Sequence, residues 1–311
     1  LWGRGETASF FGGFFGPVKA QDPGRRELRH EFNGPGEERL VLPLSCGGTL
    51  SVRGYAASEQ QVPPGWPSGS FQEWRSLIFE PSTDQDAGPP FIQSVSKVTC
   101  CPDETWLPEA DPQVLALNYP KTLSAAVAAA LKSFKISSPK ILVIGLGSGA
   151  VPLWLAEQFP ESQVDVVELE ATVISAASEK LGFPIHLPGD PDATSPLRRK
   201  MAKRLKAIEG DGAALAESWT KDGAVQRCYD AVLIDAYDAL NRVPAPLWKD
   251  DGPLVKALPS LLQKRAVLAA NVPPGFPTSS MLRSFQGVLG ATDSVKGLKP
   301  KPPPPALTFE V

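Results

Sequence analysis

The feature that most restricts how this chain can fold is a short apolar run followed at once by spaced glycines. Residues 140–144 read Lys-Ile-Leu-Val-Ile, which is typical of a strand buried on both faces of a parallel sheet. Gly145, Gly147 and Gly149 come next, and residues 151–159 then have helical spacing. This order lets backbone N–H groups and a helix N-terminus approach a ligand closely, because glycine carries no Cβ that would hold the chain away.

The segment after this helix predicts an acid that binds a ribose. Residues 163–167 are expected to form a second strand, and Glu168 follows it directly. An acidic side chain at such a strand tip can accept hydrogen bonds from both hydroxyls of a ribose. With Ala150 in the last small position, the spacing also fits the dinucleotide-binding fingerprint. The alternative interpretation is that these glycines form a tight turn in an ordinary α/β protein, with no ligand. Other segments of the chain are needed to choose between the two interpretations.

The alternation of strand and helix patterns between about residues 140 and 290 predicts an α/β fold with a Rossmann-like, doubly wound, mostly parallel sheet. Ligands bind such sheets beyond the carboxyl ends of the strands, where Asp211 and Asp235 also fall. An acid on a ribose and an aspartate beside an adenine amino group describe an adenosyl pocket. The expected strands are 140–144, 163–167, 204–209, 229–235 and 265–271, and the expected helices are 151–159, 171–180, 213–219, 254–262 and 280–290.

A small antiparallel β unit is expected ahead of this sheet, because short strand-like runs alternate there with Gly, Pro and Ser clusters. Gln93 lies inside one such run and must find a hydrogen-bond partner or face water on an edge strand. A helix is expected within 113–134, with its main part starting at Pro120. We divide the chain into an extended N-terminal arm (1–38), a small β domain (39–110), a Rossmann-like domain (111–295) and a Pro-rich C-terminal arm (296–311); the expected strands of the β unit are 39–42, 49–52, 75–80 and 91–99.

Composition excludes several classes of function. The 311 residues have a net charge of −3, which argues against a nucleic-acid-binding surface. No apolar run approaches the roughly 20 residues that a membrane-spanning helix needs. The chain has 2 histidines and 4 cysteines with no Cys-x-x-Cys spacing, so neither a Ser-His-Asp triad nor a metal site is expected.

Three segments outside these elements carry further expectations. Residues 10–16 place four phenylalanines among glycines, and residues 300–311 begin as a polyproline stretch that could end as a strand. Both arms are expected to dock on the main body or on protein partners. The basic run at 198–206 is either a site for an anionic surface or a solvated helix face that continues into a strand. The chain begins with Leu1 and looks trimmed, so no targeting peptide can be read; we expect a soluble protein of the cytoplasm or of an organelle such as a plastid or mitochondrion.

The strands, the glycine loop and the acidic strand ends described above resemble the spermidine synthase-like branch of the class I S-adenosylmethionine-dependent methyltransferase superfamily. In that branch a small β domain precedes a Rossmann-like sheet. The resemblance implies that Gln93 approaches the nucleoside, Glu168 the ribose and Asp211 the adenine. Asp235 matches an acid that helps the aminopropyltransferases to deprotonate the attacking amine. The cofactor-binding set implied for S-adenosylmethionine is Gln93, Tyr119, Gly145, Gly147, Gly149, Glu168, Asp211 and Asp235. The matching stretches are 75–79, 91–94, 119, 141–149, 167–170, 209–212 and 229–238.

Two departures from the family bear on the reaction. Aminopropyltransferases carry an acid in the glycine loop, which holds the amine of decarboxylated S-adenosylmethionine, whereas Ser148 stands at that position here. Tyr119 is followed by Pro120 and Lys121 instead of Gln-Glu, and a lysine there would repel a polyamine. A loop without the carboxylate suits intact S-adenosylmethionine, whose own carboxylate prefers backbone N–H groups.

Our first hypothesis is therefore an S-adenosylmethionine-binding methyltransferase with an unknown acceptor, in which Asp235 or Asp238 acts as general base. Asp238 could equally be a loop cap. The second hypothesis is a catalytically inactive subunit of a larger, organellar assembly, because both arms suit docking. Polyamine aminopropyl transfer is a further alternative. A nicotinamide dehydrogenase is disfavoured, because no candidate hydride-transfer residues accompany the glycine loop.

Overall fold

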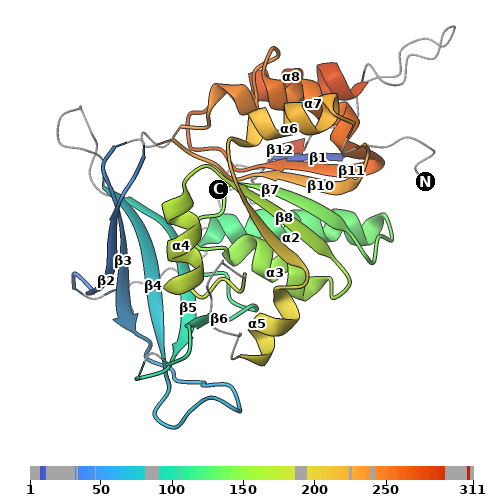
Figure 1. Ribbon diagram of the computed structural model, residues 1–311. Helices are drawn as coiled ribbons and strands as arrows, with labels where there is room; N and C mark the ends of the chain where they lie inside the picture. Colours follow the sequence, from blue (N-terminus) through green and yellow to red (C-terminus); the bar gives the residue numbers. More distant parts are fainter. Residues whose placement is uncertain are drawn as a thin grey trace, which may run out of the picture.

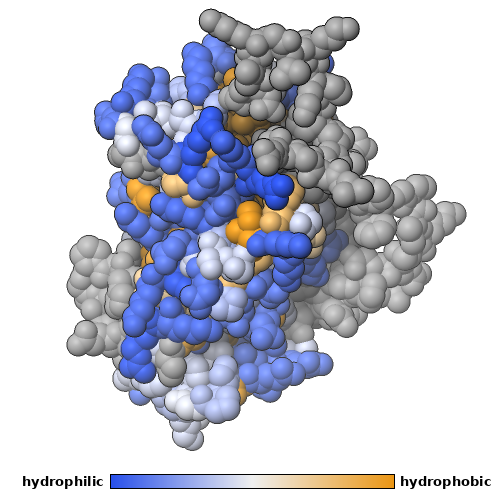
Figure 2. Space-filling model, turned by 90° about the vertical axis from the view of Figure 1, so that its right-hand side faces the viewer, coloured by the Kyte–Doolittle hydropathy of each residue, from blue (hydrophilic) through white to orange (hydrophobic). Residues whose placement is uncertain are grey.

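The chain forms two β-sheets that lie side by side, with helices around the larger one, in the computed structural model of Figure 1. No helix in the described part of the chain has the length and hydrophobicity to cross a membrane. On the face that Figure 2 shows, hydrophilic side chains dominate and apolar ones form only small patches. The structure describes residues 8–11, 32, 34–45, 47–80, 91–103, 105–185, 195–223, 226–238, 242–290 and 307–308.

The smaller sheet is antiparallel and confirms the expected β unit. Its five strands follow the order β2-β3-β4-β5-β6, and each described neighbour pair is antiparallel. Most of these strands run longer than the sequence predicted, and β6 was not predicted. The strands are β2 (Glu37–Pro43), β3 (Thr49–Ala56), β4 (Phe71–Glu80), β5 (Phe91–Cys100) and β6 (Glu109–Ala110).

The larger sheet is parallel and confirms the Rossmann-like fold class. Its strand order is β12-β1-β11-β10-β7-β8-β9, so the chain reverses direction across the sheet between β7 and β10. Such a reversal leaves a crevice beyond the carboxyl ends of the strands, where ligands bind. The strands are β1 (Ala8–Phe11), β7 (Lys140–Ile144), β8 (Gln163–Glu168), β9 (Leu205–Glu209), β10 (Tyr229–Ile234), β11 (Leu262–Ala270) and β12 (Leu307–Thr308).

Helices cover both faces of this sheet because its central strands are apolar on both sides. Ile141 and Val143 pack into one buried cluster, and Leu142 and Ile144 into the other, as the period of two in a strand requires. Helices α6, α7 and α8 lie on one face and α2 and α3 on the other (Figure 1). The helices are α2 (Asn118–Ser133), α3 (Ala150–Gln158), α4 (Ala171–Glu179), α5 (Pro196–Met201), α6 (Gly212–Lys221), α7 (Pro253–Leu261) and α8 (Thr278–Gly290), with a 3-10 turn η1 (Ala245–Leu247).

The structure adds to the expectations for the two arms and for the basic run at 198–206. Residues 8–11 of the N-terminal arm, which was expected to dock on the main body or on a partner, form β1, which pairs in parallel with β11 of the larger sheet. Residues 307–308 of the C-terminal arm form β12, which pairs with β1, in agreement with the strand considered for the end of that arm. Most other residues of both arms lie outside the described part, so their docking on partners stays a prediction. The basic run is also not simply solvated: Arg198 is buried, and its guanidinium donates to Ser178 Oγ and to the carbonyl of Ile185.

The two sheets are joined at Gly182, just after α4. Its carbonyl accepts a hydrogen bond from Ala110 N of β6 at 3.0 Å. Gly182 has a φ of +79°, and a Cβ there would lie 2.7 Å from the carbonyl carbon of Glu109. The left-handed conformation and the close approach of β6 both require glycine.

Replacing Gly182 by alanine is therefore expected to destabilise the fold more than the backbone conformation alone explains. Gly275 is the matched control, because it has the same φ of +79° with nothing within 4 Å of a built Cβ. We expect Gly275→Ala to lower the free energy of unfolding by about 1–2 kcal/mol, and Gly182→Ala by roughly 1–3 kcal/mol more. Urea denaturation followed by circular dichroism measures both, and equal losses would contradict the packing argument.

Candidate functional site

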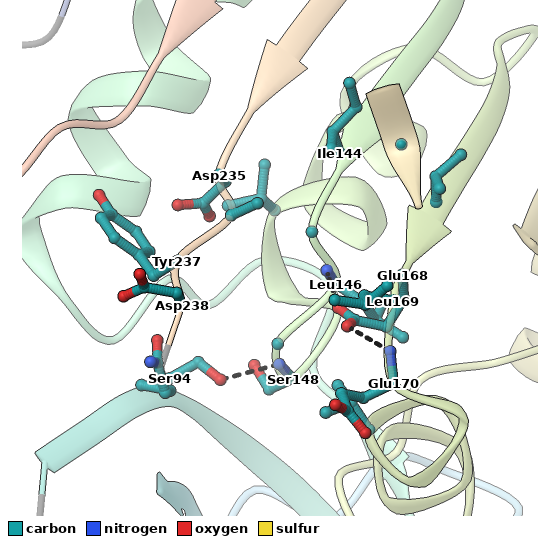
Figure 3. A pocket seen from close by; sticks show the side chains of 18 of the residues that line it. Ser94, Ile144, Leu146, Ser148, Glu168, Leu169, Glu170, Asp235, Tyr237 and Asp238 are labelled. Atoms are coloured by element: carbon teal, nitrogen blue, oxygen red, sulfur yellow. Dashed lines mark hydrogen bonds between the residues drawn. The ribbon is translucent and has the colours of Figure 1, made fainter. Parts of the chain in front are cut away.

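A cavity of about 240 Å³ opens beyond the carboxyl ends of β7, β8 and β10, and both sheets contribute to its walls (Figure 3). Glu168 and Asp211, which the sequence placed in one adenosyl pocket, both line it. Gly149 does not line the cavity; it precedes α3, where its φ is +80° and the ring of Phe183 fills the space of a Cβ. The predicted site residues that line the cavity are Gln93, Tyr119, Gly145, Gly147, Glu168, Asp211, Asp235 and Asp238.

The glycine loop is shaped by contacts with the protein's own chain. At Gly145, where φ is +97°, a Cβ would collide with the backbone carbonyl of Asp235 after β10. At Gly147, a Cβ would lie 3.0 Å from Ser94 Oγ on β5. Ser148 N donates to that same Ser94 Oγ at 2.8 Å (Figure 3). The glycines therefore let the loop fit between β10 and the small sheet, a role that the sequence did not reveal.

Glu168 links the glycine loop to the turn after β8. Its carboxylate accepts hydrogen bonds from Leu146 N at 2.9 Å and from Glu170 N at 3.0 Å. Burial raises the pKa of Glu168 above its usual value, although these N–H groups act in the opposite direction. Each carboxylate oxygen can accept a second hydrogen bond, so the side chain keeps capacity for the hydroxyls of a ribose.

Asp211 has a structural role in addition to its place in the cavity wall. It is the N-cap of α6, where its Oδ1 accepts from Ala213 N at 2.8 Å and from Ala214 N at 3.1 Å. Its second oxygen, Oδ2, lies outside these two bonds. The N-terminal turn of α6 thus fixes the direction of the carboxylate before any ligand enters.

Asp235, directly after β10, has its carboxylate held by a side-chain amide. Asn271 Nδ2 donates to its Oδ1 at 2.9 Å, and burial raises the pKa of Asp235 to about 6 against the lowering effect of this bond. Burial, and then the negative charge of Asp235, raise the pKa values of Tyr119 and Tyr237. Asn271 was recognised only as a strand end; its position at the carboxyl end of β11, beside β10, is the signal that could have identified it.

Asp238, the other predicted base, is held in an ion pair. Its Oδ1 accepts from Arg242 N at 2.9 Å, and its Oδ2 accepts from Arg242 Nε at 2.9 Å. Both oxygens therefore fix the loop after β10. This geometry is that of a loop cap, the alternative that the sequence left open for this residue.

Polar atoms without partners mark the remaining wall. Gln93 Nε2 and Ser148 Oγ are buried and have no hydrogen-bond partner within the described part of the chain. Tyr119 Oη donates to the carbonyl of Gln93 at 3.0 Å, which ties α2 to β5. Gln93 and Ser148 both line the cavity, so these two donors are available to hydrogen-bond a polar ligand there. Ser94 was not predicted as a site residue, and Ser148 was noted only as the replacement of an acid in the glycine loop; their mutual contact places both in the cavity wall.

The charge of the cavity is one-sided. Among the described residues its lining includes five carboxylates and no Lys, Arg or His side chain, and Asp238 is paired with an arginine, Arg242, from outside the lining. Leu169, at the rim beside Glu168, is 61% exposed although apolar. Within the described residues, no group of three or more His, Cys, Asp or Glu side chains is arranged to hold a metal ion. The cavity therefore suits an organic ligand that carries positive charge and one flat apolar face.

Comparisons with known proteins agree with this architecture. No protein-family model matches the chain. Over 95 residues it is 28% identical to the human eEF1A lysine and N-terminal methyltransferase, which corresponds to 30% of this chain and 11% of that protein. Over 149 residues it is 29% identical to the polyamine aminopropyltransferase of Vibrio vulnificus (strain CMCP6), which corresponds to 48% of this chain and 41% of that protein.

Among solved structures, a probable spermidine synthase from Corynebacterium glutamicum ATCC 13032 matches with a TM-score of 0.48 and 16% identity, over 81% of this chain and 68% of that one. The chain spans less than half the length of each curated relative named above. The resemblance drawn from the sequence is confirmed at the level of the fold. With its antiparallel sheet ahead of a parallel, doubly wound one and its local sequence similarity to both kinds of enzyme, the chain has a spermidine synthase-like S-adenosylmethionine methyltransferase fold.

Proposed function

We propose that this protein binds S-adenosylmethionine and transfers its methyl group to a nitrogen acceptor. The observation that carries the proposal is that the glycine loop, Glu168, Asp211 and Asp235 line one cavity at the switch point of the sheet. In open α/β sheets this is where nucleoside ligands bind. The proposal of a nitrogen acceptor is supported by the buried acid Asp235, which could take up a proton, and by the name of the human relative, a lysine and N-terminal methyltransferase.

The residues present fit the ligand group by group. Glu168 would accept from the ribose hydroxyls and Asp211 Oδ2 from the adenine amino group, while Leu169 would cover the base. The unpartnered Ser148 Oγ and the N-terminus of α3 offer donors to the methionine carboxylate. The five carboxylates of the lining favour the positive charge of the sulfonium.

When bound, S-adenosylmethionine supplies a methyl group already activated by the sulfonium, so the protein mainly has to position the reactants. Asp235 would receive the proton that the acceptor nitrogen gives up. With a pKa of about 6 the side chain is mostly ionised at pH 7, and Asn271 fixes its orientation. Asp238 is a weaker candidate for the base, because Arg242 engages both of its oxygens.

Aminopropyl transfer is the second candidate, favoured by the relative from Vibrio vulnificus. Ser148 argues against it, because a hydroxyl in the glycine loop cannot neutralise the second positive charge of decarboxylated S-adenosylmethionine. No described residue favours the third candidate, a subunit without catalysis, since most of both arms lie outside the described part.

Titration calorimetry with the two nucleosides is the first test. We expect S-adenosylmethionine to bind, and Glu168→Ala to weaken binding by about 100-fold, because a charge-assisted hydrogen bond contributes roughly 1.5–3 kcal/mol. Glu209→Ala is the matched control: Glu209 ends β9 in register with Glu168 but is exposed and outside the lining of the cavity. Tighter binding of decarboxylated S-adenosylmethionine would favour aminopropyl transfer, and no binding of either at millimolar concentration would favour the subunit without catalysis.

The second test concerns the base. In protein labelled with ¹³C at aspartate carboxyl groups, nuclear magnetic resonance should show Asp235 titrating at about 6. Asn271→Ala removes a donor that lowers this pKa, so the midpoint should move to higher pH. Because the base must be ionised, methyl transfer should fall as the pH drops below about 6 in the wild type and at higher pH in Asn271→Ala.

Gln263→Ala is the control for this test, because Gln263 is an exposed amide on the same strand, β11. The midpoint of Asp235 should be the same in that variant as in the wild type. If Asp235 instead titrated near the ordinary aspartate value of about 3.9, its carboxylate would be solvated. The argument that burial raises its pKa for a role as general base would then fail.

A further inference from the structure

The β2–β3 turn of the small sheet is held to the larger sheet by one carboxylate of the cavity wall. Glu170, just past β8, accepts a hydrogen bond from Ser45 Oγ at 2.6 Å and from Ser45 N at 3.0 Å. The two residues are 125 positions apart, and Glu170 is buried. Ser45 therefore offers both of its donors to Glu170, one to each oxygen.

The turn that Ser45 belongs to is tightly closed. Leu44 N donates to the carbonyl of Gly48, and Gly47 N to the carbonyl of Leu44, each at 3.1 Å. Gly47 and Gly48 have φ values of +90° and +87°, which glycine adopts readily. Leu44 is 8% exposed and lines the cavity together with Glu170. A fixed turn thus presents one apolar side chain to the ligand space.

These contacts continue a hydrogen-bonded path that begins in the glycine loop. Leu146 N donates to Glu168, Glu170 N donates to the other oxygen of Glu168, and the Glu170 carboxylate accepts from Ser45. Figure 3 shows Glu168 and Glu170 together on one side of the pocket, opposite Asp235 and Tyr237. The wall next to the proposed ribose acid is therefore continuous with the small sheet.

We propose that Glu170 is a positioning residue, which fixes the β2–β3 turn so that Leu44 closes the adenosyl side of the cavity. This inference rests on the proposed function for the identity of the ligand. Glu168 and Glu170 both line the cavity, but each carboxylate oxygen of Glu170 accepts a hydrogen bond from Ser45, and the role proposed for Glu170 is exerted through that contact. The small sheet is then a part of the binding site, and the Rossmann-like sheet alone holds an incomplete pocket.

Binding measurements separate this role from a general effect on stability. Glu170→Ala is expected to raise the Kd for S-adenosylmethionine about tenfold, which corresponds to about 1.4 kcal/mol, and Leu44→Ala to do the same. Because Glu170 acts through Leu44, the double variant should lose about tenfold and not about 100-fold. Glu170→Gln keeps an acceptor for Ser45 N and should restore most of the affinity. A fully additive double variant, or an unchanged Kd in Glu170→Ala, would overturn the inference.

Hydrogen exchange of the ligand-free protein tests the same contact without S-adenosylmethionine. Glu170→Ala should raise the exchange rates of the Ser45 and Gly47 amides about tenfold or more, and Ser45→Ala should raise that of Gly47 even if the first variant folds poorly. Glu179→Ala is the matched control, because Glu179 is an exposed acid on α4. Unchanged exchange rates in both Glu170→Ala and Ser45→Ala would overturn the inference. If the two variants show the expected faster exchange but the wild type does not bind S-adenosylmethionine, only the proposed function is overturned.

Discussion

The close approach of the glycine loop to the end of β10 is the constraint on which the rest of this structure depends. Gly145 lies against the backbone of Asp235, so the two strands on either side of the reversal can end side by side. Any side chain at Gly145 would separate these strand ends. The cavity, the direction of Asp235 and the start of α3 all follow from this contact, because each is attached to one of the two loops.

The small sheet completes the site through a few polar contacts. Ser94 accepts from Ser148 N, Tyr119 donates to the carbonyl of Gln93, and Ser45 donates to Glu170. The Arg75 guanidinium also donates to the carbonyl of Lys180 at the end of α4. These bonds are directional, so they define where the two sheets meet more closely than the apolar packing between them does.

Desolvation gives the acids of the cavity different properties. Glu168 and Asp235 both have raised pKa values because they are removed from water, but backbone N–H groups hold the first and a side-chain amide holds the second. Asp211 and Asp238 are held by a helix N-terminus and by an arginine. Because their hydrogen-bond partners differ, acidic side chains in one cavity can have different roles: hydrogen-bond acceptor for a ligand, helix cap, loop cap and proposed base.

Local patterns in the sequence were enough to predict the fold class and the principal acids of the cavity. Apolar runs and glycine spacing located the strands, and the carboxyl ends of parallel strands meet at one edge, so Glu168, Asp211 and Asp235 could be assigned to one site before any coordinates. Such patterns depend on neighbours within a few residues, which is why they can be read along the chain.

Only the tertiary structure decided the features that join distant segments. The Ser45–Glu170 contact, the Asn271–Asp235 hydrogen bond and the burial of Arg198 each bring together residues from separate elements. The addition of β1 to the larger sheet is of the same kind, since residues 8–11 pair with β11 more than 250 positions later. A sequence pattern records how polar a residue is, but the water it loses and the partner it gains depend on which elements pack against it.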